Sequence, residues 1–282
     1  MSETTALATR TAGLQGGGLT APATVARVMA NEAHKNLLTL WAYRKTLLPE
    51  LALAAFTYLM LQFFIGGGEL VDELVPPTMV AYVTYLFTYY VLLKVVSGLL
   101  EEVNTGTLEQ AHIGPLPSWA LSLSRIAAAM VQAGALTLVV AAGFVVGLDV
   151  DFPLRWQALV PIGLTVADVV GFALVIGGLA LTIASIGAVL HVIQGLVMFL
   201  NGSLVPVEAF PPWLELVARF VPGTLGIEAT RAVLFGDASL GALWSSGDLQ
   251  SAAGHAAAML LIGWATHQVN VRRGLRNGRL GP

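Results

Sequence analysis

The chain has 282 residues, of which 56% are hydrophobic and only 11% are charged, and its mean hydropathy is +0.76. So few polar residues cannot cover the surface of a water-soluble domain, which excludes that class of protein. The absence of cysteine excludes disulfides, thiolate metal sites and cysteine nucleophiles. The net charge of −3 is uninformative by itself, and we expect no nucleic-acid partner.

The N-terminal segment divides into two parts. Residues 1–23 are rich in Thr, Ala and Gly and lack the apolar stretch of a cleavable signal, which predicts a disordered tail. Residues 24–48 place apolar side chains, including Trp41, near helical spacing among basic ones. This pattern is typical of an amphipathic helix that lies at the membrane surface.

Apolar runs long enough to cross a bilayer recur after residue 48. A span needs about 20 such residues for a hydrocarbon core of roughly 30 Å. The runs lack the alternation of barrel strands, so we expect helices, which satisfy their own backbone hydrogen bonds. The predicted spans are 49–66, 75–98, 118–148, 157–183, 186–207 and 252–270. The sequence therefore predicts an all-α membrane protein with about six transmembrane helices.

The distribution of positive charge predicts the orientation. All but three of the 14 Lys and Arg residues lie in the tails or flank a polar loop at 99–117. The three exceptions are Arg155, Arg219 and Arg231. The positive-inside rule therefore places the loop, the N-terminus and the basic tail at 271–282 in the cytoplasm. Termini on one side require an even number of spans, in agreement with six.

The second span, 75–98, contains a cluster of tyrosines. Tyr82, Tyr85 and Tyr89 share one helical face. Tyrosine combines a flat apolar surface with a polar tip, which suits contact with an amphipathic or aromatic substrate. Packing within the protein is the alternative, and the sequence leaves both open.

An acidic segment at 99–113 interrupts the apolar runs. Thr107 and Gln110 have the spacing of a capping box, which predicts that a helix restarts near Leu108. Such a segment is either a solvated loop or a short helix that docks a soluble partner. The candidate docking residues are Glu101, Glu102, Gly106, Thr107, Leu108, Glu109 and Gln110.

Polar residues also occur in the fourth and fifth spans. Asp168 lies beside a small-residue face in the fourth, where it either pairs with a neighbouring helix or relays protons. The fifth carries a narrow polar stripe, which either joins helices by hydrogen bonds or lines a translocation path. The stripe consists of His191, Gln194, Met198 and Asn201. No second ligand stands at metal-binding spacing from His191, so no metal site is expected.

Prolines break the segment at 205–236. Each removes a backbone donor and clashes with the preceding turn, so one continuous spanning helix is excluded. We expect short helices outside or half inside the bilayer. These short helices would close the outer end of a path through the membrane and so form an outer gate. The candidate residues of this outer gate are Pro206, Glu208, Pro211, Trp213, Pro222, Glu228 and Arg231.

Two of these stretches resemble motifs of ABC-2 type transporter permeases, of the daunorubicin-resistance or polysaccharide-export kind. E-x-x-x-G-T-L-E-Q before a P-L-P break is similar to the family's cytoplasmic coupling element. G-x-x-x-P-x-x-x-x-P-x-W-L, followed by P-x-x-x-x-x-E-x-x-R, is similar to the re-entrant helices that cap its outer mouth. The resemblance covers 24–275 and implies an interface helix at 24–48 and a transmembrane domain at 49–270.

The resemblance implies a permease subunit of an ATP-binding cassette exporter in the bacterial cell membrane. The sequence lacks G-x-x-x-x-G-K-[ST], so ATP and Mg would bind two copies of a separate ATPase subunit. No catalytic residue and no cofactor are expected in this chain, which would pair with a second copy of itself. The apolar spans favour a hydrophobic drug-like or lipid-like substrate, and a polysaccharide or lipid-linked glycan is the alternative.

A proton-coupled carrier or an intramembrane enzyme is a more distant alternative. It would use Asp168, His191 and Glu208. The sequence shows no internal repeat of the kind common in carriers. It also shows no nucleophile and base at a recognisable spacing.

Overall fold

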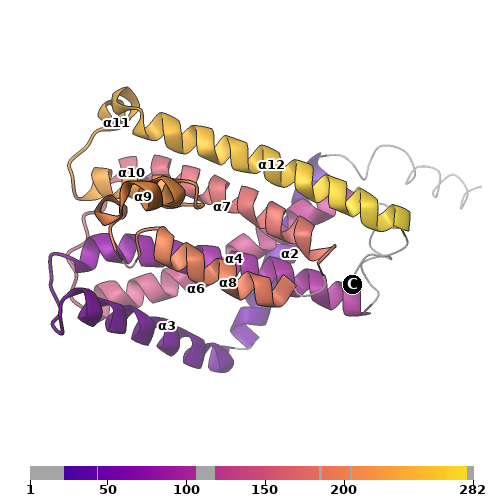
Figure 1. Ribbon diagram of the computed structural model, residues 1–282. Coiled ribbons are helices and arrows are strands. Elements are labelled where there is room, and N and C mark those ends of the chain that lie inside the picture. The colour runs from indigo at the N-terminus through magenta and orange to yellow at the C-terminus, as the bar shows by residue number, and fades with distance from the viewer. Residues whose placement is uncertain (1–21, 43, 106–117, 184–185, 204, 278–282) are drawn as a thin grey trace, which may run out of the picture.

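The computed structural model describes residues 22–42, 44–105, 118–183, 186–203 and 205–277. All regular elements within these ranges are helices, which confirms the predicted all-α class for this part of the chain (Figure 1). The longer ones are α2 (Pro22–Ala42), α3 (Arg44–Ile65), α4 (Val75–Thr105), α6 (Ser118–Gly147), α7 (Leu159–Ala180), α8 (Ile186–Leu200) and α12 (Asp248–Asn277). The shorter ones are η1 (Trp156–Ala158), η2 (Val207–Ala209), α9 (Pro212–Arg219), α10 (Thr224–Leu234) and α11 (Leu240–Ser246).

Four stretches of helix within the described residues are long and apolar enough to cross a membrane. They are Leu47–Ile65, Val75–Glu102, Ala120–Gly147 and Trp156–Ala180. The apolar α8 has 15 residues and is shorter than a usual span. The 30-residue α12 has the length, but His255, His267 and other polar side chains reduce its hydropathy. The chain is a multi-pass membrane protein, and the fifth and sixth spans remain predictions.

The boundary between the first two helices differs from the predicted one. α2 ends at Ala42, before the expected end of the amphipathic helix at residue 48. α3 begins at Arg44, so Pro49 is its sixth residue and lies inside it. Proline there lacks the N–H that would bond to the carbonyl of Lys45, so the second turn of the helix has one backbone hydrogen bond fewer.

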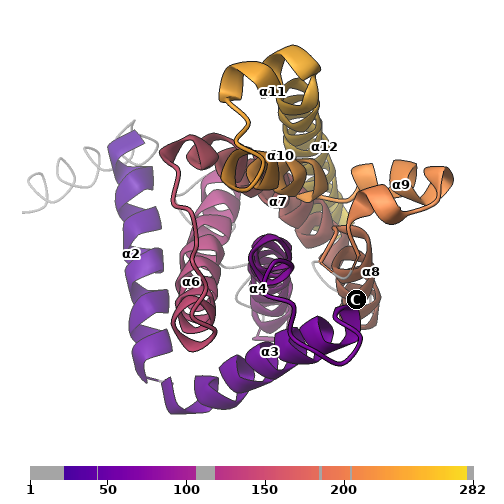
Figure 2. The ribbon, with the colours of Figure 1, turned by 90° about the vertical axis from the view of Figure 1, so that its left-hand side faces the viewer.

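Helices α4, α6, α7, α8 and α12 run side by side, while α2 crosses them and α3 runs obliquely to them (Figures 1 and 2). α2 packs mainly on α6, at the end of the bundle where α4 ends and α6 begins. An orientation across the bundle is the one that a helix lying in the membrane surface would adopt.

Small residues bring α7 and α12 into backbone contact. A Cβ atom added to Gly171 would lie 2.4 Å from the backbone carbon of Met259, and one added to Gly263 would lie 2.1 Å from the Gly171 carbonyl oxygen. Such contact is the usual way to gain packing energy between helices in lipid. Nearer the start of α7, a Cβ atom added to Gly163 would meet nothing within 4 Å. The close packing therefore begins near Gly171 and fixes α12 against the middle of α7.

Candidate functional site

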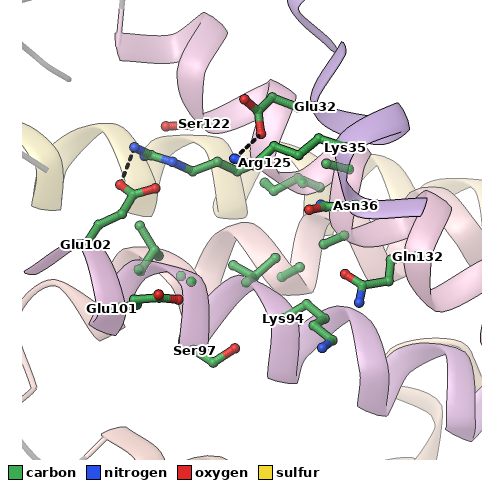
Figure 3. Close-up of a pocket in the computed structure, with 18 of the residues that line it drawn as sticks. Glu32, Lys35, Asn36, Lys94, Ser97, Glu101, Glu102, Ser122, Arg125 and Gln132 are labelled. Carbon is green, nitrogen blue, oxygen red and sulfur yellow. Dashed lines mark hydrogen bonds and ion pairs between the residues drawn. The ribbon is translucent and has the colours of Figure 1, made fainter. Parts of the chain in front are cut away.

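A polar cavity of about 700 Å³ lies where α4 ends and α6 begins (Figure 3). Helices α2, α4 and α6 supply most of its lining, with Gly177 from α7 and His267 from α12. Its other polar residues include Glu32, Lys35, Asn36, Lys94, Ser97, Glu101, Glu102, Ser122, Arg125 and Gln132. A cavity with this lining can hold water or polar groups at the end of an otherwise apolar bundle.

Charges of both signs are partly neutralised within the cavity. Arg125 of α6 forms an ion pair with Glu102 of α4, and Lys35 of α2 lies 3.5 Å from Glu32 (Figure 3). The first of these pairs ties the end of α4 to the start of α6. Lys94 lines the same cavity and forms no ion pair within the part of the chain that the structure describes.

The acidic end of α4 borders this cavity. The span was expected to end at residue 98, but the helix continues to Thr105, about 10 Å further at 1.5 Å per residue. Glu101 is exposed on this extension, and Glu102 is half-buried. The remaining predicted docking residues, Gly106 to Gln110, lie outside the described residues.

The tyrosines of α4 divide between packing and partial exposure. Tyr82 is buried, its hydroxyl donates to the Ala54 carbonyl at 2.7 Å, and its ring centroid lies 5.1 Å from that of Tyr58. These contacts join α4 to α3. Tyr85 and Tyr89 are half-buried, with ring centroids 6.0 Å apart. Packing accounts for Tyr82, and the other two keep surface that a substrate could reach.

The predicted stripe on α8 is split between two environments. Gln194 is buried, and its amide donates to the Tyr89 carbonyl at 3.4 Å. Asn201 accepts from the Ser203 amide at 3.0 Å and from its hydroxyl at 2.6 Å. Met198 is half-buried and His191 is exposed. Gln194 and Asn201 therefore face the bundle, whereas His191 faces out of it.

Short helices occupy the proline-rich segment. Pro206 precedes η2, Pro211 and Pro212 begin α9, and Pro222 lies between α9 and α10. Trp213 is 67% exposed on α9, which stands out from the bundle (Figure 2). Each proline therefore marks a break or a helix start, where its missing N–H costs no hydrogen bond.

Arg231, Glu228 and Glu208 form the charged part of this segment. Arg231 donates to the carbonyls of Pro77 at 2.7 Å and Gly202 at 2.9 Å. Glu228 has one buried carboxylate oxygen without a partner, while Glu208 is exposed. Burial, and secondarily the charge of Glu208, raises the pKa of the Glu228 carboxyl.

Sequence reasoning missed His255 of α12. Its Nδ1 lies 3.0 Å from an Asp168 carboxylate oxygen, and the Gly223 amide donates to the same carboxylate at 2.7 Å. Asp168 thus pairs with two neighbouring elements, and neither of them is α8, which carries His191. A histidine within a predicted span was the available signal, because ionisable groups inside a membrane are usually paired.

Comparison with known proteins now gives the family. The family model for ABC-2 type transporters matches residues 33–235. The chain belongs to the ABC-2 type transporter family. This match confirms the family that the two motifs resemble. This ABC-2 permease is also 27% identical over 176 residues to the probable multidrug ABC transporter permease YbhR of Escherichia coli strain K12.

YbhR of Escherichia coli O157:H7 matches to the same extent. The alignment covers 61% of this permease and 46% of YbhR, so the chain spans about half the length of the curated relatives it matches.

Proposed function

We propose that this ABC-2 permease is the membrane subunit of an exporter that is driven by a separate ABC ATPase. Two copies of the permease would enclose the path, and two ATPase subunits would bind at the cytoplasmic face. The exporter would lie in the bacterial cell membrane, with both termini of the permease in the cytoplasm. The charge distribution of the sequence supports this orientation.

The observation that carries the proposal is the acidic end of α4 beside the polar cavity. α4 continues as one helix from the span to Thr105, so a displacement of its cytoplasmic end by the ATPase would move the part of the helix inside the bundle. The ion pair between Glu102 and Arg125 would transmit the same displacement to α6. The exposed Glu101 offers the ATPase a charge to bind.

The substrate that we propose is a hydrophobic drug-like or lipid-like molecule. The name of YbhR as a probable multidrug permease supports this class. The half-buried Tyr85 and Tyr89 offer aromatic surface with polar tips, which suits an amphipathic molecule. A polysaccharide or a lipid-linked glycan is the second candidate, because aromatic rings also pack on sugar faces.

The test is transport by the complex in proteoliposomes. The permease is reconstituted with its candidate ATPase, and uptake of a fluorescent hydrophobic dye into inside-out vesicles is followed with and without ATP. We expect ATP-dependent uptake that is lost when the Walker A lysine of the ATPase is replaced. Uptake that needs no ATPase but follows a proton gradient would instead support a carrier. Transport of a labelled glycan without dye uptake would support the second substrate class.

A further inference from the structure

The polar cavity between α2, α4 and α6 has two levels along the bundle. Lys94 precedes Glu101 by seven residues on α4, and Gln132 follows Arg125 by seven residues on α6. Because α4 ends and α6 begins at this cavity, Lys94 and Gln132 both lie about 10 Å deeper in the bundle than Glu101 and Arg125, at 1.5 Å per residue. Figure 3 shows the same division, with Glu102 and Arg125 at one end and Lys94 and Gln132 toward the other.

The two levels differ in charge. The lining contains three cations and three carboxylates, and the two ion pairs described above neutralise four of these groups. The remaining carboxylate, Glu101, is exposed at the outer level. The remaining cation, Lys94, is half-buried, and no described residue forms an ion pair or a hydrogen bond with it. The deep level therefore carries one unpaired positive charge.

Gln132 adds an unused amide to the same level. It lines the cavity and is only 7% exposed, yet it forms no hydrogen bond with any residue that the structure describes. Buried polar groups nearly always have a hydrogen-bond partner, so this amide requires water or a ligand in the cavity. Asn36 of α2 also lines the cavity, half-buried and without such a bond to the described part of the chain. The deep level thus offers an ammonium and amide N–H groups to an acceptor.

The cavity opens beside α2, the helix expected at the membrane surface. Lys35 and Thr39 of α2 and Ser97 of α4 are lining residues that are exposed. An amphipathic helix of this kind lies at the boundary of headgroups and acyl chains, and α4 continues past it (Figure 1). Leu38 and Val131, each next to a lining residue in the sequence, are 56% and 40% exposed. The opening therefore combines polar groups with apolar surface that acyl chains can cover.

Volume and charge together define the class of ligand. A volume of about 700 Å³ is in the range of pockets that hold molecules much larger than a single ion. A phosphodiester carries one negative charge and accepts hydrogen bonds, so it matches one ammonium and the neighbouring amides. Pockets between membrane helices that contain basic residues bind anionic lipid headgroups at the cytoplasmic side. A bilayer presents such headgroups at the level of α2.

We propose that this cavity binds the headgroup of an anionic phospholipid from the leaflet in which α2 lies. Lys94 donates to the phosphodiester, Gln132 and Asn36 donate amide N–H groups to it, and the acyl chains leave past the exposed Leu38. Because α2 packs mainly on α6, the headgroup also connects α2 to α4. The inference rests on the proposed function only where it identifies that leaflet as the cytoplasmic one.

The first test compares two lipids with the same acyl chains. The permease is titrated in detergent with phosphatidylglycerol, which is anionic, or with phosphatidylcholine, which is zwitterionic. Native mass spectrometry then gives the Kd of the first bound lipid. We expect phosphatidylglycerol to bind at least about tenfold more tightly, because a choline cation would lie beside Lys94. Equal affinities for the two lipids would overturn the proposal.

Three variants locate the binding of phosphatidylglycerol. Lys94→Gln should raise the Kd by at least about tenfold, the effect of losing a hydrogen bond between charged groups. Gln132→Leu should raise it by about threefold or more, since one amide donor is lost. Lys45→Gln is the matched control, because Lys45 is exposed at the start of α3 and does not line the cavity. Equal Kd values in Lys94→Gln and Lys45→Gln would place the lipid elsewhere and overturn the assignment.

A second measurement uses the unaltered chain, so it does not depend on how the variants fold. Phosphatidylglycerol with a photoreactive diazirine in its headgroup is activated in nanodiscs that contain the permease, and the labelled peptides are identified. We expect labels within 32–39, 94–105 and 122–132, and their loss in the presence of excess unlabelled phosphatidylglycerol but not of phosphatidylcholine. Labels spread evenly over the exposed surface would show non-specific contact and contradict the site.

Competition separates the lipid from other occupants. If a tenfold excess of inorganic phosphate prevents the labelling, an unanchored anion is sufficient and the lipid assignment is wrong. If the hydrophobic dye prevents it, the cavity binds the transported compound instead, which also overturns the proposal. Labelling that resists both supports a lipid. None of these measurements needs ATP or an ATPase, so failure to bind lipid would leave the exporter proposal intact, and failure of ATP-driven uptake would leave the lipid site intact.

Discussion

The guanidinium of Arg231 on α10 donates a hydrogen bond to the backbone carbonyl of Pro77 at the start of α4, with 2.7 Å between Nε and the oxygen. A second N–H of the same side chain reaches the Gly202 carbonyl, just beyond α8. One half-buried cation thus ties three elements at the end of the bundle that carries the proline-rich segment.

We expect Arg231→Lys to destabilise the protein, although it keeps the charge. A lysine ammonium cannot reproduce the two directed bonds of the planar fork. Losing one of them should reduce the free energy of unfolding by about 1.5–3 kcal/mol. Arg219→Lys is the control, because Arg219 forms an exposed pair with Glu215 that contributes about 1 kcal/mol or less. The measurement is reversible unfolding in mixed detergent micelles, and equal effects of the two variants would contradict the expectation.

Glu228 should make stability depend on pH. Its pKa is raised in the folded state, chiefly by burial, so the folded protein binds this proton more tightly than the unfolded chain does. The folded state is therefore favoured at low pH and loses that advantage as the pH rises through the folded-state pKa. Glu228→Gln stays neutral, so its stability relative to the parent should increase from pH 4 to pH 8. Thermal unfolding at each pH is the measurement, with Glu73→Gln as control, because Glu73 is exposed in the turn between α3 and α4 and forms no ion pair with a described residue. A constant difference across this range would contradict the assignment.

The sequence predicted what depends on local pattern and missed what depends on helix pairing. Apolar runs predicted where the long helices lie, and prolines predicted where the segment after α8 breaks, because both effects act within a few residues. The partner of Asp168 could not be found this way, because His255 lies 87 positions along the chain and meets it through the contact of α7 with α12. The outward position of His191 likewise depends on how α8 rotates against α4.

Coupling to an ATPase should depend on the acidic segment. Replacing Glu101 and Glu109 together by lysine should leave insertion and assembly unchanged, since Glu101 is exposed and forms no ion pair with a described residue. It should abolish substrate-stimulated ATP hydrolysis, because the docking surface changes sign. The matched control replaces Asp72 and Glu73, two exposed acids in the turn between α3 and α4 at the opposite end of the bundle. Normal stimulation in the first variant, or its loss in the control, would contradict docking at 99–113.

The last prediction concerns assembly. A path between helices needs more spans than one chain offers, so we expect a homodimer with α8 at its interface. Val192, Leu196 and Phe199 form an exposed apolar face on α8, whereas Leu190 and Val197 are buried.

Because the chain lacks cysteine, single-cysteine variants can be cross-linked one by one in membranes. Cysteines on the exposed face should give covalent dimers, and those at the two buried positions should not. The control is Leu138→Cys on α6, which is 70% exposed and outside the expected interface. Lipid contact alone would expose Leu138 and the α8 face equally, so equal cross-linking at both would reject a specific interface. Cross-linking that follows only the α8 face would show that two copies meet there, which the enclosed path requires.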